Sequence, residues 1–397
     1  MDLRQASTSR LVALSLALSL GAAVSLGVTR FAYGLLLPPM RADLQWSYTL
    51  AGAMNTANAL GYLLGALATP FLLRRVGPSR LLLAGAWLAS LFMGLTGFFT
   101  QAAPLLAQRV LAGTASAFLF IAGGLLAARL GALQPRRAGF LLGIYYGGTG
   151  LGIVLSALLV PALLRAAGAR PQGWAWAWWA LAVACVAATL VLAWPARRLA
   201  SLQPHAAGGD GQGAALRWPD FAPALAGYAL FGVGYIGYMT FVIALLREQG
   251  VAGGRITLFY ALLGIAVLAS SRIWAGLLDR FRGGQPLALL NALLGAATLV
   301  PALTAAWPAV LASGLVFGAV FLSVVASTTA LVRHNLPQAQ WAAGISAFTI
   351  VFAAGQIVGP TVVGWIADGP GGLARGLAFS AGALWLGALL AWRQRAL

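Results

Sequence analysis

Apolar residues occur along the chain in twelve long runs that are separated by short polar breaks. A helix needs about 20 mostly apolar residues to cross the hydrocarbon core of a bilayer. The pattern therefore predicts twelve transmembrane helices, and the first run is too long for the apolar core of a signal peptide. The predicted spans are 11–37, 47–73, 81–100, 104–128, 138–164, 174–194, 221–246, 256–278, 286–306, 309–332, 341–366 and 373–392.

The composition agrees with a protein that lies in lipid. Of the 397 residues, 61% are hydrophobic and 8% are charged, whereas soluble domains carry roughly a quarter charged residues. Soluble enzymes, disordered chains and secreted disulfide scaffolds are excluded, and the single Cys185 cannot form an internal disulfide. The predicted fold class is an all-α polytopic membrane protein.

The net charge of +18 comes from 25 arginines against 7 acidic residues. Such an excess can indicate nucleic-acid binding, but the arginines are not gathered in a stripe or tail. Sixteen fall at one set of helix ends and six at the other, and Arg30, Arg109 and Arg272 lie within spans. This is the positive-inside pattern. It predicts no nucleic-acid partner, cytoplasmic N- and C-termini and, given the exclusive use of arginine, a bacterial inner-membrane protein.

The longest polar break, residues 195–220, lies near the midpoint and is rich in glycine. It predicts a cytoplasmic linker between an N-terminal half, 1–194, and a C-terminal half, 221–397. Several residues of the first half recur 205 positions later: Gly27-Val28 as Gly232-Val233, Tyr33 as Tyr238, and Arg75 as Arg280. A constant interval suggests two similar six-helix halves.

Two connections carry a related motif. Gly276, Asp279 and Arg280 follow the eighth span, and Arg75 and Gly77 follow the second. The loop after the eighth span resembles the Gly-x-x-x-Asp-Arg-x-Gly-Arg motif of the major facilitator superfamily. The resemblance implies two pseudo-symmetric six-helix bundles that work by alternating access, with Arg75, Gly77, Asp279 and Arg280 at the inner gate. The alternative is that these arginines only anchor the helix ends.

The fourth span contains Arg109 and Gly113, which look like the Arg-x-x-x-Gly signature of the same family. Arg109 either serves the gating machinery or extends toward the lipid headgroups, because it lies close to the outer end of its span. Glycines in the fifth span, 143–152, and around Gly355 and Gly359 in the eleventh predict close helix packing.

Arg30 is the most informative residue because it lies deep within the first span. A charge at this depth usually faces a cavity or a partner. Tyr33 lies three positions further on, and the equivalents of the two in the second half are Tyr235 and Tyr238. In the family that the chain resembles, the first helix of each half lines a central cavity, which implies that these four residues bind substrate.

A guanidinium group stays charged and offers donors that suit a carboxylate or a phosphate. The predicted substrate is therefore a small organic anion. The alternative for Arg30 is a structural bond to carbonyl groups or to Asn55 or Asn58. Arg272 is a second candidate for the substrate, unless it pairs with Asp279 or reaches the inner headgroups, and Tyr145 is a further candidate lining residue.

None of the seven acidic residues lies deep in a predicted span. Asp43 and Glu248, which are 205 positions apart, are expected at the outer gate, where they can pair with Arg41 and Arg247. Without a buried carboxylate, uniport, anion exchange, or symport of a proton with an anionic substrate is more natural than carboxylate-coupled drug antiport. A coupling proton or a counter-anion is thus an expected partner.

The sequence contains no phosphate-binding loop, metal-ligand cluster or nucleophile–base pair. We therefore expect a monomeric transporter in the lipid bilayer that moves a small molecule, with no enzymatic activity and no cofactor. Efflux of amphipathic drugs or neutral metabolites through an aromatic cavity is the alternative. A membrane sensor without transport is a third hypothesis.

Overall fold

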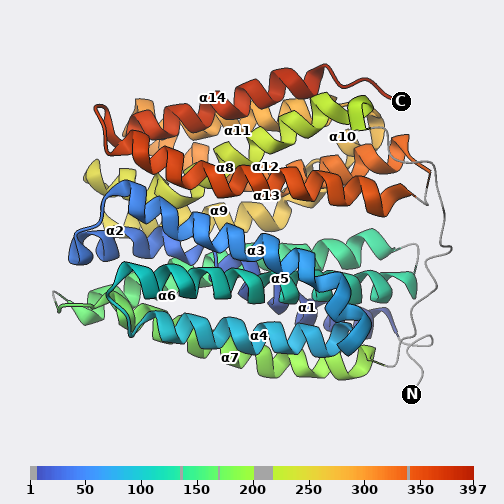
Figure 1. Ribbon diagram of the computed structural model, residues 1–397, viewed down its shortest axis with the longest axis horizontal. Coiled ribbons are helices and arrows are strands. Elements are labelled where there is room, and N and C mark those ends of the chain that lie inside the picture. The colour runs from blue at the N-terminus through green and yellow to red at the C-terminus, as the bar shows by residue number, and fades with distance from the viewer. Residues whose placement is uncertain (1–6, 135–136, 169, 201–217, 338–339) are drawn as a thin grey trace. The chain divides into compact units, whose positions relative to one another are not determined.

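The computed structural model describes residues 7–134, 137–168, 170–200, 218–337 and 340–397, and this part of the chain is helical without strands (Figure 1). Its helices are α1 (Thr8–Ala22), η2 (Ala23–Val28), α2 (Ala32–Leu44), α3 (Tyr48–Val76), α4 (Pro78–Thr96), α5 (Ala102–Ala132), α6 (Ala138–Ala167), α7 (Trp174–Leu199), η4 (Trp218–Phe221), α8 (Ala222–Glu248), α9 (Gly253–Ile273), α10 (Ala275–Arg280), α11 (Gln285–Leu303), α12 (Trp307–Asn335), α13 (Trp341–Ala367) and α14 (Gly372–Trp392).

Within the described residues, twelve stretches are long and apolar enough to cross a membrane. They coincide with the twelve predicted spans, so the predicted all-α polytopic fold class is confirmed. Most extend a few residues beyond the predicted ends. The first one, Thr8–Leu44, is not one regular helix but consists of α1, η2 and α2 in succession.

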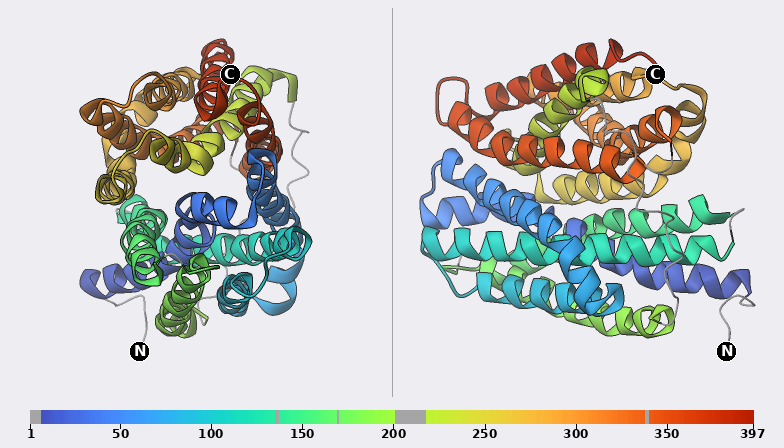
Figure 2. Two further views of the ribbon diagram at one scale, coloured as in Figure 1. Left: turned by 90° about the vertical axis from the view of Figure 1, so that its left-hand side faces the viewer. Right: turned by 45° about the vertical axis from the view of Figure 1, so that its right-hand side comes forward.

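The chain separates into two compact units, one of Met1–Gln45 with Ala57–Pro204, the other of Trp46–Thr56 with His205–Leu397. The end-on view in Figure 2 shows each unit as a bundle of helices. The first turns of α3 thus belong to the second unit and the rest of this helix to the first. Of the predicted linker, 195–220, residues 201–217 lie outside the described part of the chain.

Glycines set the helix spacing in the first unit. A Cβ atom on Gly148 of α6 would overlap the carbonyl oxygen of Ser19 in α1, and one on Gly152 would overlap the carbonyl oxygen of Ala23. Gly27 of η2 faces Gly152 in return. The backbones of α6 and the first span therefore touch directly, as the glycine pattern predicts, because contact at this range requires residues without side chains.

The second unit repeats this contact. Gly232 of α8 lies against Gly355 of α13, and Gly359 lies against the carbonyl oxygen of Val233. Gly232 stands 205 positions after Gly27, so the interval of the sequence matches holds for the first helix of each contact, whereas the partner glycines Gly152 and Gly355 are 203 positions apart.

We predict that Gly148→Ala destabilises the protein by about 1–3 kcal/mol, because the added methyl group overlaps the backbone of α1. Gly139→Ala in the same helix is the matched control, since a Cβ there meets no atom within 4 Å. Thermal unfolding in detergent should show a lower melting temperature for Gly148→Ala only. Equal melting temperatures for the two variants would contradict the close contact.

Candidate functional site

The first span is interrupted where its buried arginine lies. The amide N–H and the hydroxyl of Thr29 both donate to the carbonyl of Val24, at 3.0 and 2.7 Å, and the N–H of Phe31 donates to Leu26 at 3.1 Å. These five-residue intervals define a π-helical turn, which is rare and often occurs at functional sites. The residues Thr29–Phe31 then link η2 to α2, so Arg30 lies in a break of the helix.

Arg109 approaches this break from α5. Its Nη1 donates to the carbonyl oxygen of Thr29 at 3.0 Å, and its Cζ lies 5.0 Å from the centre of the Tyr33 ring. Arg109 is 3% exposed. The side chain therefore points into the first unit and not toward lipid headgroups, so the snorkelling alternative was wrong.

Close packing between α3 and α5 positions Arg109. A Cβ on Gly113 would overlap the carbonyl oxygen of Asn58, and one on Gly61 would overlap that of Val110. The Asn58 side chain donates to the carbonyl oxygen of Arg109 at 3.2 Å. Gly113 thus lets α5 approach α3, and from this position the Arg109 side chain reaches the carbonyl oxygen of Thr29 on the first span.

A second link joins the π-helical turn to α5. The hydroxyl of Ser25 donates to the carbonyl oxygen of Ser116 at 2.8 Å, and the hydroxyl of Ser116 donates to the carbonyl oxygen of Ser25 at 2.6 Å. Ser116 lies two turns after Arg109 on the same face of α5. The irregular turn is therefore held at two points, which fixes the backbone that carries Arg30.

Arg30 is also 3% exposed, and its Cζ lies 5.8 Å from the centre of the Tyr62 ring. Its Nε and Nη2 atoms are buried without a hydrogen-bond partner among the described residues. The alternative bonds to Asn55 or Asn58 do not involve these two atoms, and the side-chain amides of Asn58 and Asn55 donate to the Arg109 carbonyl oxygen and to Thr240. Arg30 therefore presents unpaired donors inside an apolar bundle.

The two guanidinium groups carry positive charges that repel each other. Asp43 is the one acidic residue among the described residues of the first unit, and it lies at the far end of α2. At about 1.5 Å per helical residue, the 13 positions between Arg30 and Asp43 correspond to roughly 20 Å. No carboxylate in the described part of this unit therefore lies near enough to balance the charge of the arginine pair.

The aromatic ring beside Arg30 comes from another helix. Tyr33 lies under Arg109, whereas the ring beside Arg30 is Tyr62 of α3, which we did not predict. Tyr62 lies one helical turn after Asn58, on the same face of the second span. The polar residues on this face were the signal from which Tyr62 could have been predicted. Tyr145 is fully buried and donates to the carbonyl oxygen of Phe120 at 2.7 Å.

The family model described as "Uncharacterised MFS-type transporter YbfB" matches residues 22–392. The chain belongs to this family. It is thus a transporter of the major facilitator superfamily, as the loop motif and the Arg109–Gly113 pair suggested. No curated protein matches the chain.

Solved structures of transporters share the fold. A bacterial homologue of the human lysosomal transporter Spinster, in an inward-facing and occupied conformation, superimposes with a TM-score of 0.72 at 17% identity, covering 97% of this chain and 96% of that one. The nucleoside transporter NupG superimposes with a TM-score of 0.70 at 14% identity, covering 98% of each chain. At this identity the likeness shows the major facilitator fold alone.

In the second unit, the predicted tyrosines of this transporter are buried and bonded. The hydroxyl of Tyr235 donates to Gln356 at 3.0 Å, and that of Tyr238 lies 3.2 Å from the Ser313 hydroxyl. Tyr235 also stacks on the rings of Phe231, Phe321 and Phe352. Their role toward substrate, and that of Tyr33, stays a prediction.

The residues of the family's loop motif lie at helix ends. Arg75 lies over the Phe71 ring and Arg280 over the Phe281 ring. Gly77 joins α3 to α4 with a φ of 77°, a left-handed conformation that favours glycine. Asp279 is exposed and makes no ion pair with the described residues, so the alternative pairing with Arg272 was wrong. Their gating roles stay predictions.

The substrate role of Arg272 is likewise untested. It lies exposed in the last turn of α9. Within the first unit, the structure places Arg109 next to Arg30, the residue predicted to bind the anion. The basic residue that accompanies Arg30 thus comes from the same half of the transporter.

The two acidic residues expected at the outer gate accept hydrogen bonds from aromatic side chains. Asp43 accepts from the indole of Trp174 at 2.7 Å and from the N–H of Gln172 at 3.1 Å. Glu248 accepts from the hydroxyl of Tyr48. Both carboxylates thus accept from an aromatic side chain, and their expected pairing with Arg41 and Arg247 at an outer gate stays a prediction.

Asp368 takes part in a contact that sequence analysis missed. Its carboxylate accepts from the N–H groups of Tyr48 and Thr49 at 2.7 and 2.8 Å, and from the Thr49 hydroxyl at 2.6 Å. These are the first two residues of α3, so Asp368 caps this helix from 320 positions away. Both the hydrogen bonds and the helix dipole favour a negative charge at this point.

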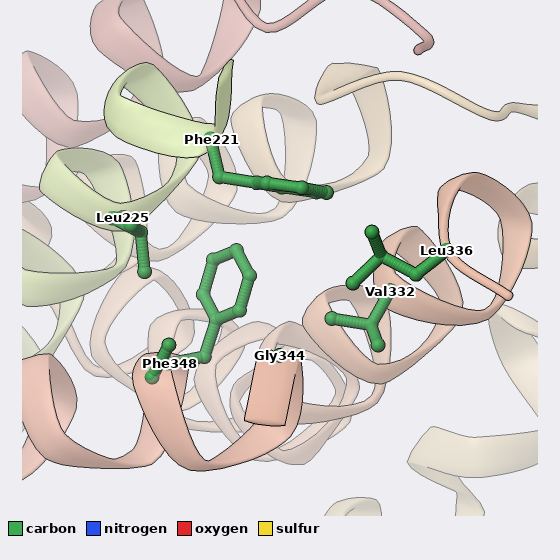
Figure 3. A pocket seen from close by; sticks show the side chains of 7 residues that line it. Phe221, Leu225, Val332, Leu336, Gly344 and Phe348 are labelled. Atoms are coloured by element: carbon green, nitrogen blue, oxygen red, sulfur yellow. The ribbon is translucent and has the colours of Figure 1, made fainter. Parts of the chain in front are cut away.

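A pocket in the second unit lies where α8, α12 and α13 meet, lined by Phe221, Leu225, Val332, Leu336, Gly344, Ala347 and Phe348 (Figure 3). All of these side chains are apolar, so the pocket offers no donor or charge to orient a polar substrate. The buried arginines are therefore the candidate site.

We predict that Asp368→Ala lowers stability by about 1–2 kcal/mol, because the first N–H groups of α3 lose their acceptor. Asp279→Ala removes the same charge from an exposed position and should leave the melting temperature unchanged. If the two variants melt alike, the cap does not contribute to stability.

Proposed function

We propose that this transporter moves a small organic anion by alternating access and that Arg30 binds the anionic group of the substrate. The observation that carries the proposal is the buried guanidinium whose Nε and Nη2 lack partners. A buried donor without a partner costs free energy, and the cost is larger for a charged group. A carboxylate or phosphate oxygen that accepts hydrogen bonds from Nε and Nη2 would remove this cost.

The positions of the acidic residues support the same proposal. In the second unit, the acids of the described part lie at helix ends or in short helices: Asp220, Glu248, Asp279 and Asp368. Neither unit thus supplies a carboxylate at mid-span to balance Arg30. In this proposal the substrate provides the negative charge, and transport is exchange of anions or symport of an anion with a proton.

We further propose that the protein resides in the bacterial inner membrane with both termini in the cytoplasm. The support is the distribution of arginines between the two sets of helix ends. Alkaline phosphatase fused within residues 74–80 should be inactive, since the enzyme folds only outside the cytoplasm, and a fusion within 168–173 should be active. The reverse pattern would contradict this orientation.

The substrate class is tested by thermal unfolding of the purified protein with dicarboxylates, monocarboxylates, phosphates, sugars, amino acids and cationic dyes. A bound ligand stabilises the folded protein by mass action and so raises the melting temperature. The stabilisation is about 2.7 kcal/mol when the free ligand concentration is one hundred times the Kd. We expect stabilisation by anions, and we expect Arg30→Gln to abolish it while the protein still folds.

Arg165→Gln is the matched control, because it removes one positive charge from an exposed position of the same unit. Arg30→Lys keeps the charge but loses the planar pair of donors, so it should bind anions more weakly than the wild type. Stabilisation only by cationic dyes or neutral compounds, unchanged in Arg30→Gln, would overturn the proposal in favour of efflux.

A further inference from the structure

We infer that the ligand of this site carries two negative charges, one bound by Arg30 and the other balanced by Arg109. The inference rests on the proposed function and deepens it, because it names the charge of the substrate. A dicarboxylate and a phosphate monoester both have this chemistry.

The first step concerns the free edge of Arg30. Nε and Nη2 are the two atoms without partners, and their N–H bonds run side by side along one edge of the planar group. This edge matches two oxygens of one carboxylate or one phosphate, which it binds with two parallel hydrogen bonds. Arg30 alone therefore accounts for one anionic group.

The second step concerns the net charge. Arg109 lies within hydrogen-bond distance of the residue that precedes Arg30 and is equally buried. Its bond to the Thr29 carbonyl oxygen engages a neutral acceptor, and the Tyr33 ring beneath it is neutral as well. The two arginines carry two positive charges, and the acidic residue in the described part of this unit, Asp43, lies at the far end of α2. One negative charge at Arg30 would therefore balance only one of these two charges in a region of low dielectric.

The third step concerns the asymmetry between the two halves of the repeat. The positions 205 residues after Arg30 and Arg109 are Tyr235 and Gly314, whereas Gly113 recurs as Gly318. Gly318 packs against the carbonyl oxygen of Leu263 as Gly113 does against that of Asn58. The second unit thus builds the same helix contact without an arginine, so helix packing alone does not require Arg109.

The test compares ligands that differ by one charge. The probes are glutarate with its monomethyl ester, succinate with succinamate, and phenyl phosphate with methyl phenyl phosphate, each titrated into the full-length protein at pH 8 in low-chloride buffer. Tryptophan fluorescence gives the Kd of each probe. We expect the dianion of at least one pair to bind about tenfold or more tightly than its monoanion. The pair that shows the preference distinguishes carboxylates from phosphates.

Variants of Arg109 test whether this residue balances the second negative charge of the ligand. The readout is the ratio of the two Kd values in a pair, because loss of the bond to Thr29 can weaken both members alike. Arg109→Gln should reduce this ratio to within about threefold, and Arg109→Lys should retain the preference because it retains the charge. A purely structural role of Arg109 would weaken both members of a pair equally. If Arg109→Gln does not fold, the ratio of monoanion Kd to dianion Kd is compared between the wild type and Arg109→Lys instead.

The outcomes separate the two proposals. Equal Kd values within every pair, all lost in Arg30→Gln, would overturn the dianion inference and leave anion transport standing. A dianion preference that persists in Arg109→Gln would overturn the role of Arg109. Absence of binding by every anion would overturn both this inference and the proposed function.

Discussion

The burial of two positive charges in an apolar bundle is the constraint on which the site depends. Arg30 and Arg109 are each 3% exposed, and the described part of their unit has no carboxylate near them. An ion without a partner is expensive in a medium of low dielectric. The fold accommodates Arg109 with a carbonyl oxygen and a ring, but leaves an edge of Arg30 without a protein partner. In the proposed function, the anionic substrate completes the charge balance.

Glycine contacts give this pair its geometry. Gly148 and Gly152 bring α6 onto the first span, and Gly61 and Gly113 bring α5 onto α3. The first span is thereby held against the backbone of α6, and α5 reaches it through the side chains of Ser116 and Arg109, which satisfy polar groups of the π-helical turn. The irregular backbone at Arg30 is a product of tertiary packing and not of local propensity.

The sequence was sufficient for the twelve spans and for the burial of Arg30, because hydropathy and a charge deep in a span are visible without any contact. It was insufficient for the neighbours of Arg30. A regular helix places Tyr33 beside Arg30, but the break at Thr29–Phe31 changes the phase, so Tyr33 meets Arg109 and Tyr62 meets Arg30. Arg109 was ambiguous because hydropathy does not locate a helix end within a turn, whereas α5 begins about two turns before it.

One further feature is the helix α3, which is continuous from Tyr48 to Val76 although its first turns belong to the second unit and the remainder to the first. A helix is stiff over this length, so it acts as a mechanical linkage. Any rotation of one unit against the other has to bend α3 near Thr56 or release its start from Asp368, Glu248 and Thr240. For the proposed alternating access, the few hydrogen bonds at this helix terminus are thus part of the resistance to rotation.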